Sequence, residues 1–227
     1  MTIRVAIDGP AGAGKSTVAK SVARQIQVPY VDTGAIYRSL TWQAIHLGVP
    51  LDSEQALAEL ATGLEILFIP EGAAQRVFVQ GVDLTEAIRE PDISASVSQV
   101  ATYPLVREKL LGIQYAFATS PHGVVMDGRD IGTRIIPDAD VKVFLTASLA
   151  VRARRRYDEL MRQGFSVELA RLHEELAARD FSDQNRKASP LRPAEDAVTL
   201  DTSLLSVEEA TAMVVALCEV RRKNKEV

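Results

Sequence analysis

Short apolar runs alternate with helical stretches along this chain. The runs fall at residues 3–7, 29–31, 124–126, 141–145 and 198–200, and each has the length of a buried strand. Helical stretches separate most of them, and a helix between two strands favours a right-handed crossover that leaves the strands parallel. The pattern predicts an α/β fold built on a parallel sheet.

One region departs from this alternation and predicts a small antiparallel sheet. Its expected elements are a helix at residues 53–61 ended by Gly63, strands at 64–69 and 76–80 with a turn at 70–74 between them, and a short third strand from Gly81 through Leu84. The simplest interpretation is a subdomain inserted between strands of the core. The alternative is that the segment only thickens the core.

Two helices carry a predicted inner face. In the helix that follows Asp32, this face consists of Ile36, Leu40, Ala44 and Leu47. The last helix starts with a capping box formed by Ser206 and Glu209. Its inner face consists of Val207, Val214 and Leu217.

The composition is that of an ordinary globular protein. The 227 residues are 47% hydrophobic and 25% charged, which suits one α/β domain with a large core. A formal net charge of -4 argues against nucleic-acid binding, and the single Cys218 fits a reducing compartment. No apolar run reaches the roughly 20 residues of a membrane span, and no signal peptide precedes the first strand. We therefore expect a cytoplasmic protein without a membrane partner.

The first strand leads directly into a phosphate-binding motif of the form G-x-x-x-x-G-K-[ST]. Its glycines let backbone N–H groups surround a polyphosphate, and the following helix adds its positive end. Lys15 would reach the β- and γ-phosphates, and the Ser16 hydroxyl would ligate Mg²⁺. A glycine-rich turn that matches by chance is the alternative. With strand, helix, Lys and Ser in register, the motif predicts binding of a nucleoside triphosphate. The residues expected around it are Gly9, Pro10, Ala11, Gly12, Ala13, Gly14, Lys15, Ser16 and Thr17.

A second candidate segment follows the second strand. Asp32-Thr33-Gly34 opens a helix at the carboxyl edge of the sheet, the same edge that carries the phosphate motif. Arg38, one turn into that helix, can reach a second anion that faces the first. Taken alone, Asp32 and Thr33 are more typical of a helix cap than of a binding site.

A third candidate segment, Asp127-Gly128-Arg129-Asp130, ends an apolar strand. Asp127 could hold a Mg²⁺-bound water at the strand end, and Gly128 allows a tight exit of the chain. Arg129 and Asp130 would then stand at the same edge as the phosphate motif. The alternative is a strand-end turn with a surface Arg–Asp pair.

Basic residues then gather on one helix. Arg152, Arg155 and Arg156 share a face, while Arg154 points elsewhere. Such a run is usually a solvated surface, but beside a phosphate loop it favours cations that neutralise charge during phosphoryl transfer. A further set at helical spacing forms either a salt-bridge ladder or substrate-facing groups: Arg179, Asp183 and Arg186.

The order and spacing of these segments resemble the bacterial cytidylate kinase family over nearly the whole chain. The matching blocks are residues 8–15, 32–38, 98–101, 106–108, 127–132 and 179–186. The phosphate motif is shared by many enzymes, whereas the Asp-Thr-Gly-Ala-Ile-Tyr-Arg and Asp-Gly-Arg-Asp blocks are much more specific. The resemblance implies a P-loop kinase with a five-stranded parallel sheet core, a small antiparallel β insert and a helical lid. It implies a single domain with a core of residues 1–32, 121–147 and 196–227, a monophosphate-binding region of residues 33–120, and an Arg-rich lid with flanking helices at residues 148–195.

The resemblance also implies residue roles in transfer of a phosphoryl group from Mg-ATP to CMP, and to dCMP. Arg38, Arg129 and Arg186 would hold the acceptor phosphate; Thr33, Arg179 and Asp183 would contact the ribose; Ser98, Arg107 and Asp130 would read the cytosine; Arg155 and Arg156 would approach the transferring group. Together with Lys15, Arg129 and these two lid arginines form the expected catalytic set. Thr33 and Ser16 stand where some relatives have Ser and Gly, which makes the Ser16 hydroxyl helpful to Mg²⁺ rather than essential.

Two other functions stay open from the residues alone. A kinase for another small anion, such as a hydroxy acid, would keep the phosphate motif but need an ionisable base near a hydroxyl. A nucleotide-dependent switch ATPase would need no second anion site, so the paired arginine blocks disfavour it. We expect a monomer, and the sequence leaves the roles of Asp8 and Asp32 unassigned.

Overall fold

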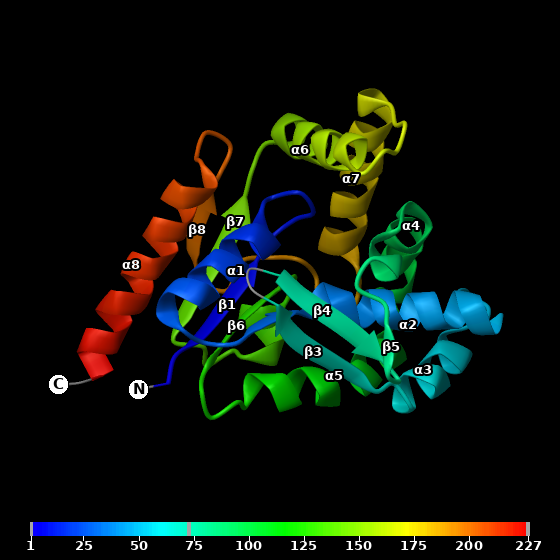
Figure 1. Cartoon of the computed structure of the whole chain (residues 1–227), viewed down its shortest axis with the longest axis horizontal. Helices are drawn as coiled ribbons and strands as arrows, with labels where there is room; N and C mark the ends of the chain where they lie inside the picture. Colours follow the sequence, from blue (N-terminus) through cyan, green and yellow to red (C-terminus); the bar gives the residue numbers. More distant parts are fainter. Residues whose placement is uncertain (1, 72–73, 226–227) are drawn as a thin grey trace.

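The central sheet is parallel, and its strands run in the order β2-β6-β1-β7-β8 (Figure 1). The computed structural model describes residues 2–71 and 74–225. The strands of this sheet are β1 (Arg4–Asp8), β2 (Tyr30–Asp32), β6 (Val124–Gly128), β7 (Val141–Thr146) and β8 (Val198–Asp201). All five correspond to strands predicted from the apolar runs, so that prediction is confirmed. β1 pairs with β6 on one side and β7 on the other, which puts the phosphate motif at the middle of the sheet.

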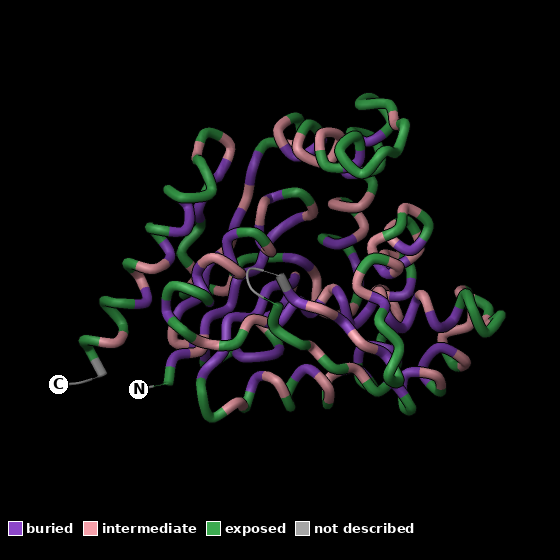
Figure 2. Tube along the Cα trace, in the orientation of Figure 1, coloured by how far each residue is buried: buried purple, intermediate pink, exposed green. Residues whose placement is uncertain are grey.

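Helices cover both faces of this sheet. The α-helices of the described residues are α1 (Lys15–Ile26), α2 (Thr33–Leu47), α3 (Glu54–Thr62), α4 (Pro91–Val100), α5 (Pro104–Ala118), α6 (Leu149–Arg162), α7 (Leu169–Asn185) and α8 (Val207–Lys225), and only some of them lie against this sheet. α1 and α8 share one core cluster with β1 and β7, in which Val18, Val22 and Val214 are buried. On the opposite face, Met126 of β6 packs with α5 and with a π-helical turn, Ile131–Ile135. Figure 2 shows the resulting buried positions along the central strands.

A separate antiparallel sheet stands beside this core. It consists of β3 (Ile66–Glu71), β4 (Ala74–Val79) and β5 (Val82–Asp83). The predicted hairpin and third strand are confirmed, but β5 stops before Leu84. The prediction of a turn at residues 70–74 is wrong at its ends, because Pro70 and Glu71 belong to β3 and residue 74 starts β4. Residues 72 and 73 lie outside the described residues.

The small sheet forms a second core with α2, α3, α4 and α5. Val77 and Val79 are buried there together with Leu57 of α3. The Gln75 amide of β4 donates to the Tyr30 carbonyl of β2 at 2.6 Å, which joins this region to the central sheet. The rings of Phe68 in β3 and Phe117 in α5 lie 5.1 Å apart. The insert thus has a core of its own rather than merely thickening the main one.

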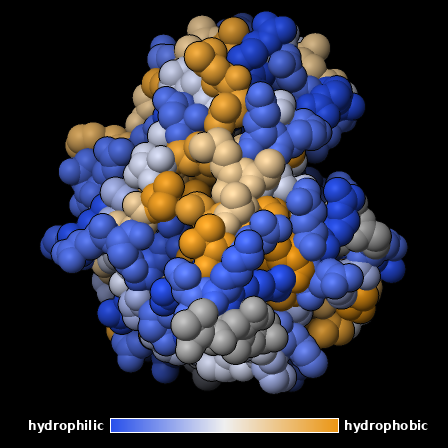
Figure 3. Space-filling view, turned by 90° about the vertical axis from the view of Figure 1, so that its left-hand side faces the viewer, coloured by the Kyte–Doolittle hydropathy of each residue, from blue (hydrophilic) through white to orange (hydrophobic). Residues whose placement is uncertain are grey.

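The prediction of a buried inner-face position is wrong for two residues. Leu47 is 64% exposed and Val207 is 41% exposed, whereas the other residues of both predicted faces are buried or half-buried. Each stands at a helix end, where neighbouring elements no longer cover it. The capping box is confirmed: the Ser206 N–H donates to Glu209 Oε2 at 2.8 Å, and the Glu209 N–H donates to Ser206 Oγ at 3.1 Å. Figure 3 views the face that carries α8, where apolar patches interrupt a hydrophilic surface.

No helix in the described part of the chain combines the length and the apolar character that a membrane-crossing segment needs.

Asp8 ties the end of β1 to the π-helical turn that follows β6. Its two carboxylate oxygens accept the backbone N–H groups of Ile131 and Gly132, at 2.8 and 2.7 Å. Burial raises the pKa of Asp8 to about 6, although both backbone hydrogen bonds oppose that rise. Asp8, to which no role could be assigned from the sequence, therefore fixes the chain just after the Asp127–Asp130 segment.

We expect Asp8→Asn to lower the free energy of unfolding by about 1–3 kcal/mol, because an amide can satisfy only one of the two buried N–H groups. Chemical denaturation at pH 7 measures the change. The matched control is Asp138→Asn, which removes an exposed ion pair with Arg4. It should shift stability by less than about 1 kcal/mol. Equal effects of the two variants would contradict the structural role of Asp8.

Candidate active site

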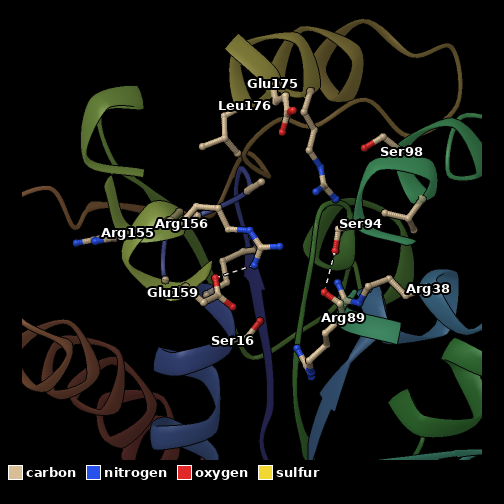
Figure 4. A pocket seen from close by; sticks show the side chains of 18 of the residues that line it. Ser16, Arg38, Arg89, Ser94, Ser98, Arg155, Arg156, Glu159, Glu175 and Leu176 are labelled. Atoms are coloured by element: carbon tan, nitrogen blue, oxygen red, sulfur yellow. Dashed lines mark hydrogen bonds and ion pairs between the residues drawn. The ribbon is translucent and has the colours of Figure 1, made fainter. Parts of the chain in front are cut away.

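A large cleft opens at the carboxyl edge of the central sheet, between α2 and α4 on one side and α6 and α7 on the other (Figure 4). Its volume of about 1760 Å³ exceeds that of an ordinary one-ligand pocket, roughly 300–1,000 Å³. The predicted residues that line it are Thr33, Arg38, Ser98, Arg107, Asp127, Arg129, Asp130, Arg155, Arg156, Arg179, Asp183, Arg186 and residues 11–17. Gly9 and Pro10 are buried beneath the loop instead of lining the cleft.

The phosphate loop is shaped by close backbone approaches. At Gly9 a Cβ atom would lie 1.9 Å from the carbonyl oxygen of Leu145 in β7. At Gly12, where φ is +76°, it would lie 3.0 Å from Arg152 at the root of α6. Only glycine fits these positions. The loop leads into α1, which starts at Lys15 with its N-terminal N–H groups at the cleft.

Lys15 is buried and folds back onto its own loop, donating to the Pro10 carbonyl at 2.8 Å. Burial, followed by repulsion from Arg129, lowers the pKa of Lys15 to about 7. An ammonium group in this position lacks a full counter-charge. A bound anion would supply one and favour the protonated form.

Asp127 ends β6 beside the start of α1. Its carboxylate accepts the Ser16 hydroxyl at 3.0 Å and the Tyr30 hydroxyl at 2.6 Å. Burial and then the neighbouring Asp32 raise the pKa of Asp127, so the site would gain from a cation. Hydroxyl and carboxylate oxygens suit Mg²⁺. Among the described residues no group of three or more His, Cys, Asp or Glu could hold a metal ion, so further Mg²⁺ ligands would come from water and phosphate oxygens.

Asp32 caps the start of α2, whereas the helix-cap interpretation is wrong for Thr33, whose hydroxyl binds the backbone of β6. Asp32 Oδ1 accepts the Ala35 N–H at 3.0 Å, so the interpretation of Asp32 as a helix cap is confirmed. Its other oxygen forms an ion pair with Arg38 at 2.6 Å. Burial would raise the pKa of Asp32, but Arg38 and Arg89 lower it overall. The Thr33 hydroxyl donates to the Asp127 carbonyl at 2.7 Å, which joins α2 to β6.

The Asp127–Asp130 segment does not form a surface Arg–Asp pair, so that alternative is wrong. Arg129 donates through Nε to Asp183 of α7 at 2.8 Å. Asp130 is buried and forms an ion pair with Arg107 of α5. The two neighbours thus connect β6 to different helices across the cleft.

Arg186 follows the end of α7 and has a fully enclosed guanidinium. It lies 3.5 Å from Asp183 and 4.0 Å from Asp130, and its Nε donates to the Ser189 carbonyl at 2.7 Å. Arg179, one turn before Asp183, has its pKa lowered to about 10, first by burial and then by Arg129. The predicted salt-bridge ladder of Arg179, Asp183 and Arg186 is therefore confirmed only for the ion pair between Asp183 and Arg186.

Three buried arginine donors in this cleft lack a hydrogen-bond acceptor in the described part of the chain: Arg38 Nε, Arg179 Nε and Arg186 Nη2. A buried unsatisfied donor costs about 1–3 kcal/mol, and more when it is charged. Their accumulation at one place indicates that an anion completes the site. Arg38 comes from α2 and Arg179 from α7, while Arg186 follows α7, and all three line the same cleft as the phosphate loop.

The arginines of the basic helix α6 differ in their contacts, and only some of them line the cleft. Arg152 is not a cleft group, because it forms an ion pair with Asp180 at 2.6 Å and donates to the Ala11 carbonyl at 3.1 Å. Arg155 is turned toward Thr202, to which it donates twice, and it points away from the middle of Figure 4. Arg156 points into the cleft and pairs with Glu159 at 2.8 Å.

Arg89 and the Arg152 anchor were not found from the sequence. Arg89 lines the cleft beside Arg38 but stands in the short 3₁₀ turn Ala87–Arg89, which has no motif. Asp180 follows Arg179 in a matching block, and that adjacency was the only available signal for the Arg152–Asp180 pair.

The parallel sheet, the phosphate loop and the two-sided cleft define a P-loop kinase. A family model described as "Cytidylate kinase" matches residues 5–220. A cytidylate kinase of Desulfitobacterium hafniense (strain Y51) is 52% identical over 95% of this chain and 92% of its own length, and one of Geobacillus thermodenitrificans (strain NG80-2) is 49% identical over 96% and 97%. The chain therefore belongs to the cytidylate kinase family.

A solved structure shares the fold at low sequence identity. It is that of an uncharacterized protein from Eubacterium ventriosum ATCC 27560, with a TM-score of 0.51 and 12% identity over 97% of this chain and 99% of the other. At that identity the likeness concerns the fold alone.

We expect triphosphate binding at pH 8 to take up close to one proton, because Lys15 with a pKa of about 7 is mostly neutral there and becomes charged beside the phosphates. At pH 6 Lys15 is already protonated, so uptake should fall to about 0.1 proton. Calorimetry of Mg-ATP binding in buffers of different ionisation enthalpy measures the number of protons taken up. The phosphates are fully ionised at pH 8.

Lys15→Arg is the control, because an arginine there stays charged at both pH values. The variant should show little proton uptake at pH 8. Equal uptake by both proteins would assign the proton to another group.

Proposed function

We propose that this chain transfers the γ-phosphoryl group of Mg-ATP to CMP and dCMP, giving ADP and the cytidine diphosphates. The observation that carries this proposal is the set of buried arginine donors without hydrogen-bond partners among the described residues, whose residues line the same cleft as the phosphate loop. Membership of the cytidylate kinase family supports CMP as the acceptor.

The triphosphate would bind on residues 9–17, with Lys15 leaving the Pro10 carbonyl for a phosphate oxygen. Mg²⁺ would be held by Ser16 and, through water, by Asp127, and it would neutralise charge on the phosphates. Near Arg155, Leu205 in the loop after β8 and Val207 at the start of α8 add to the lining an apolar surface suited to the adenine ring. We propose that residues 148–195 act as a lid over this half of the cleft.

The acceptor would bind opposite the triphosphate. Arg38, Arg129 and Arg186 would hold its phosphate, and their free or exchangeable donors fit that role. Thr33, Arg179 and Asp183 would contact the ribose. Ser98, Arg107 and Asp130 would read the base, with the buried Arg107–Asp130 pair offering both a donor and an acceptor to the cytosine edge.

Transfer needs no covalent intermediate. The acceptor phosphate oxygen is ionised at neutral pH and attacks the γ-phosphorus in line, so no strong general base is required. The chain's contribution is positioning, charge neutralisation and exclusion of water. Arg155 would have to leave Thr202, and Arg156 would have to leave Glu159, to reach the transferring group; lid closure would accompany that change. We further propose that the enzyme works as a cytoplasmic monomer.

An acceptor panel tests this function. ADP formation from Mg-ATP would be measured with CMP, dCMP, UMP, AMP, GMP and shikimate, and without acceptor. We expect CMP and dCMP to give the highest kcat/KM. Turnover with shikimate alone would support a hydroxy-acid kinase, and hydrolysis that no acceptor stimulates would support a switch ATPase.

The base-reading residues give a sharper prediction. An amide at position 130 offers an N–H donor that suits O4 of uracil and mismatches the amino group of cytosine. We therefore expect Asp130→Asn to narrow the CMP/UMP ratio of kcat/KM by roughly 10- to 100-fold. Asp92→Asn, at an exposed acid that lines the same cleft, is the matched control and should leave the ratio unchanged. If Asp130→Asn lowers kcat/KM equally for CMP and UMP, Asp130 only positions Arg107.

A further inference from the structure

Arg89 reaches the acceptor side of the cleft from a segment that no motif covers. It ends the 3₁₀ turn between the small antiparallel sheet and α4, and its side chain is 32% exposed. In Figure 4, Arg89 and Arg38 come from different elements and lie on the same side of the cleft, opposite Ser16 and Arg156.

The guanidinium of Arg89 is held only weakly. Its Nη2 lies 3.6 Å from Asp32 Oδ2, the same oxygen that Arg38 already contacts at 2.6 Å. The other Asp32 oxygen accepts the Ala35 N–H. A separation of 3.6 Å is longer than a hydrogen bond, so the five N–H donors of Arg89 have no strong acceptor among the described residues.

The surroundings of Arg89 carry excess positive charge. Arg38, Arg89 and Lys20 all act on the single carboxylate of Asp32. Burial lowers the pKa of Lys20, and Arg89 lowers it further. Asp127 is a second carboxylate that acts on Lys20, so three cations face two carboxylates, which leaves room for a ligand with negative charge at this place.

We propose that Arg89 binds the phosphate of the acceptor nucleotide, exchanging its loose contact with Asp32 for a phosphate oxygen. This inference rests on the proposed function. The exchange moves the guanidinium from a loose ion pair with a carboxylate to a phosphate and breaks no covalent bond. The acceptor rather than ATP is the ligand, because Arg89 shares Asp32 with Arg38 and faces the phosphate loop from across the cleft. The same contact would link the acceptor to the turn that joins the small sheet to α4.

The test compares phosphate-bearing and phosphate-free ligands. Dissociation constants of CMP and cytidine, and kcat and KM for CMP, would be measured for the wild type, Arg89→Met and Arg89→Lys. We expect Arg89→Met to weaken CMP binding by roughly 10- to 100-fold and to leave cytidine binding and the melting temperature unchanged. Arg89→Lys keeps the charge but not the planar fork, so its CMP affinity should lie between the two.

Arg76→Met is the matched control. Arg76 also pairs with one aspartate, Asp83, and its side chain is 41% exposed, but it stands on β4 outside the cleft. Its loss should leave the affinities for both ligands unchanged.

Two results would overturn the inference. One is an unchanged ratio of CMP to cytidine affinity in both Arg89 variants. The other is an equal loss for CMP and cytidine together with a lower melting temperature, which would make Arg89 a structural partner of Asp32. A wild-type protein that fails to phosphorylate CMP would instead overturn the proposed function. If the wild type phosphorylates CMP and the Arg89 variants keep the wild-type ratio of CMP to cytidine affinity, only this inference is overturned.

Discussion

Charge balance between buried aspartates and arginines is the constraint on which the cleft depends. Asp32, Asp130 and Asp183 each hold a cleft-lining arginine through an ion pair. Without these carboxylates, the guanidinium groups would be buried beside one another at a cost of several kcal/mol. The pairs leave some donors unsatisfied, so the site is assembled before a ligand arrives and still favours an anion.

The scaffold fixes these groups through a few long-range contacts. Asp8 holds the chain after β6, and Arg152 joins the phosphate loop at Ala11 to Asp180 of α7. The phosphate loop and helices α6 and α7 are therefore joined through one buried arginine. The arginines proposed to reach the transferring phosphoryl group are instead tied by exchangeable contacts at the cleft edge.

Local patterns were sufficient to predict the strands, the phosphate loop and the capping box of α8, because each depends on neighbours in sequence. Contacts across the fold were not predictable in this way. Asp8 lies 123 residues from Ile131, and no spacing rule relates them. Arg152 shares a helical face with Arg155, yet tertiary packing gives Arg152 a structural partner and turns Arg155 toward the loop after β8. The exposure of Leu47 likewise reflects what lies beyond the helix end, which periodicity does not report.

The central claim is that one cleft binds two phosphorylated ligands with their phosphates facing each other. Binding of a single molecule in which adenosine and cytidine are joined through five phosphates tests it most directly. If both sites are occupied together, linking the two halves should give a dissociation constant at least about 100-fold below that of ATP or CMP, and the compound should displace both. An affinity no better than that of ATP, with CMP binding undisturbed, would contradict the account.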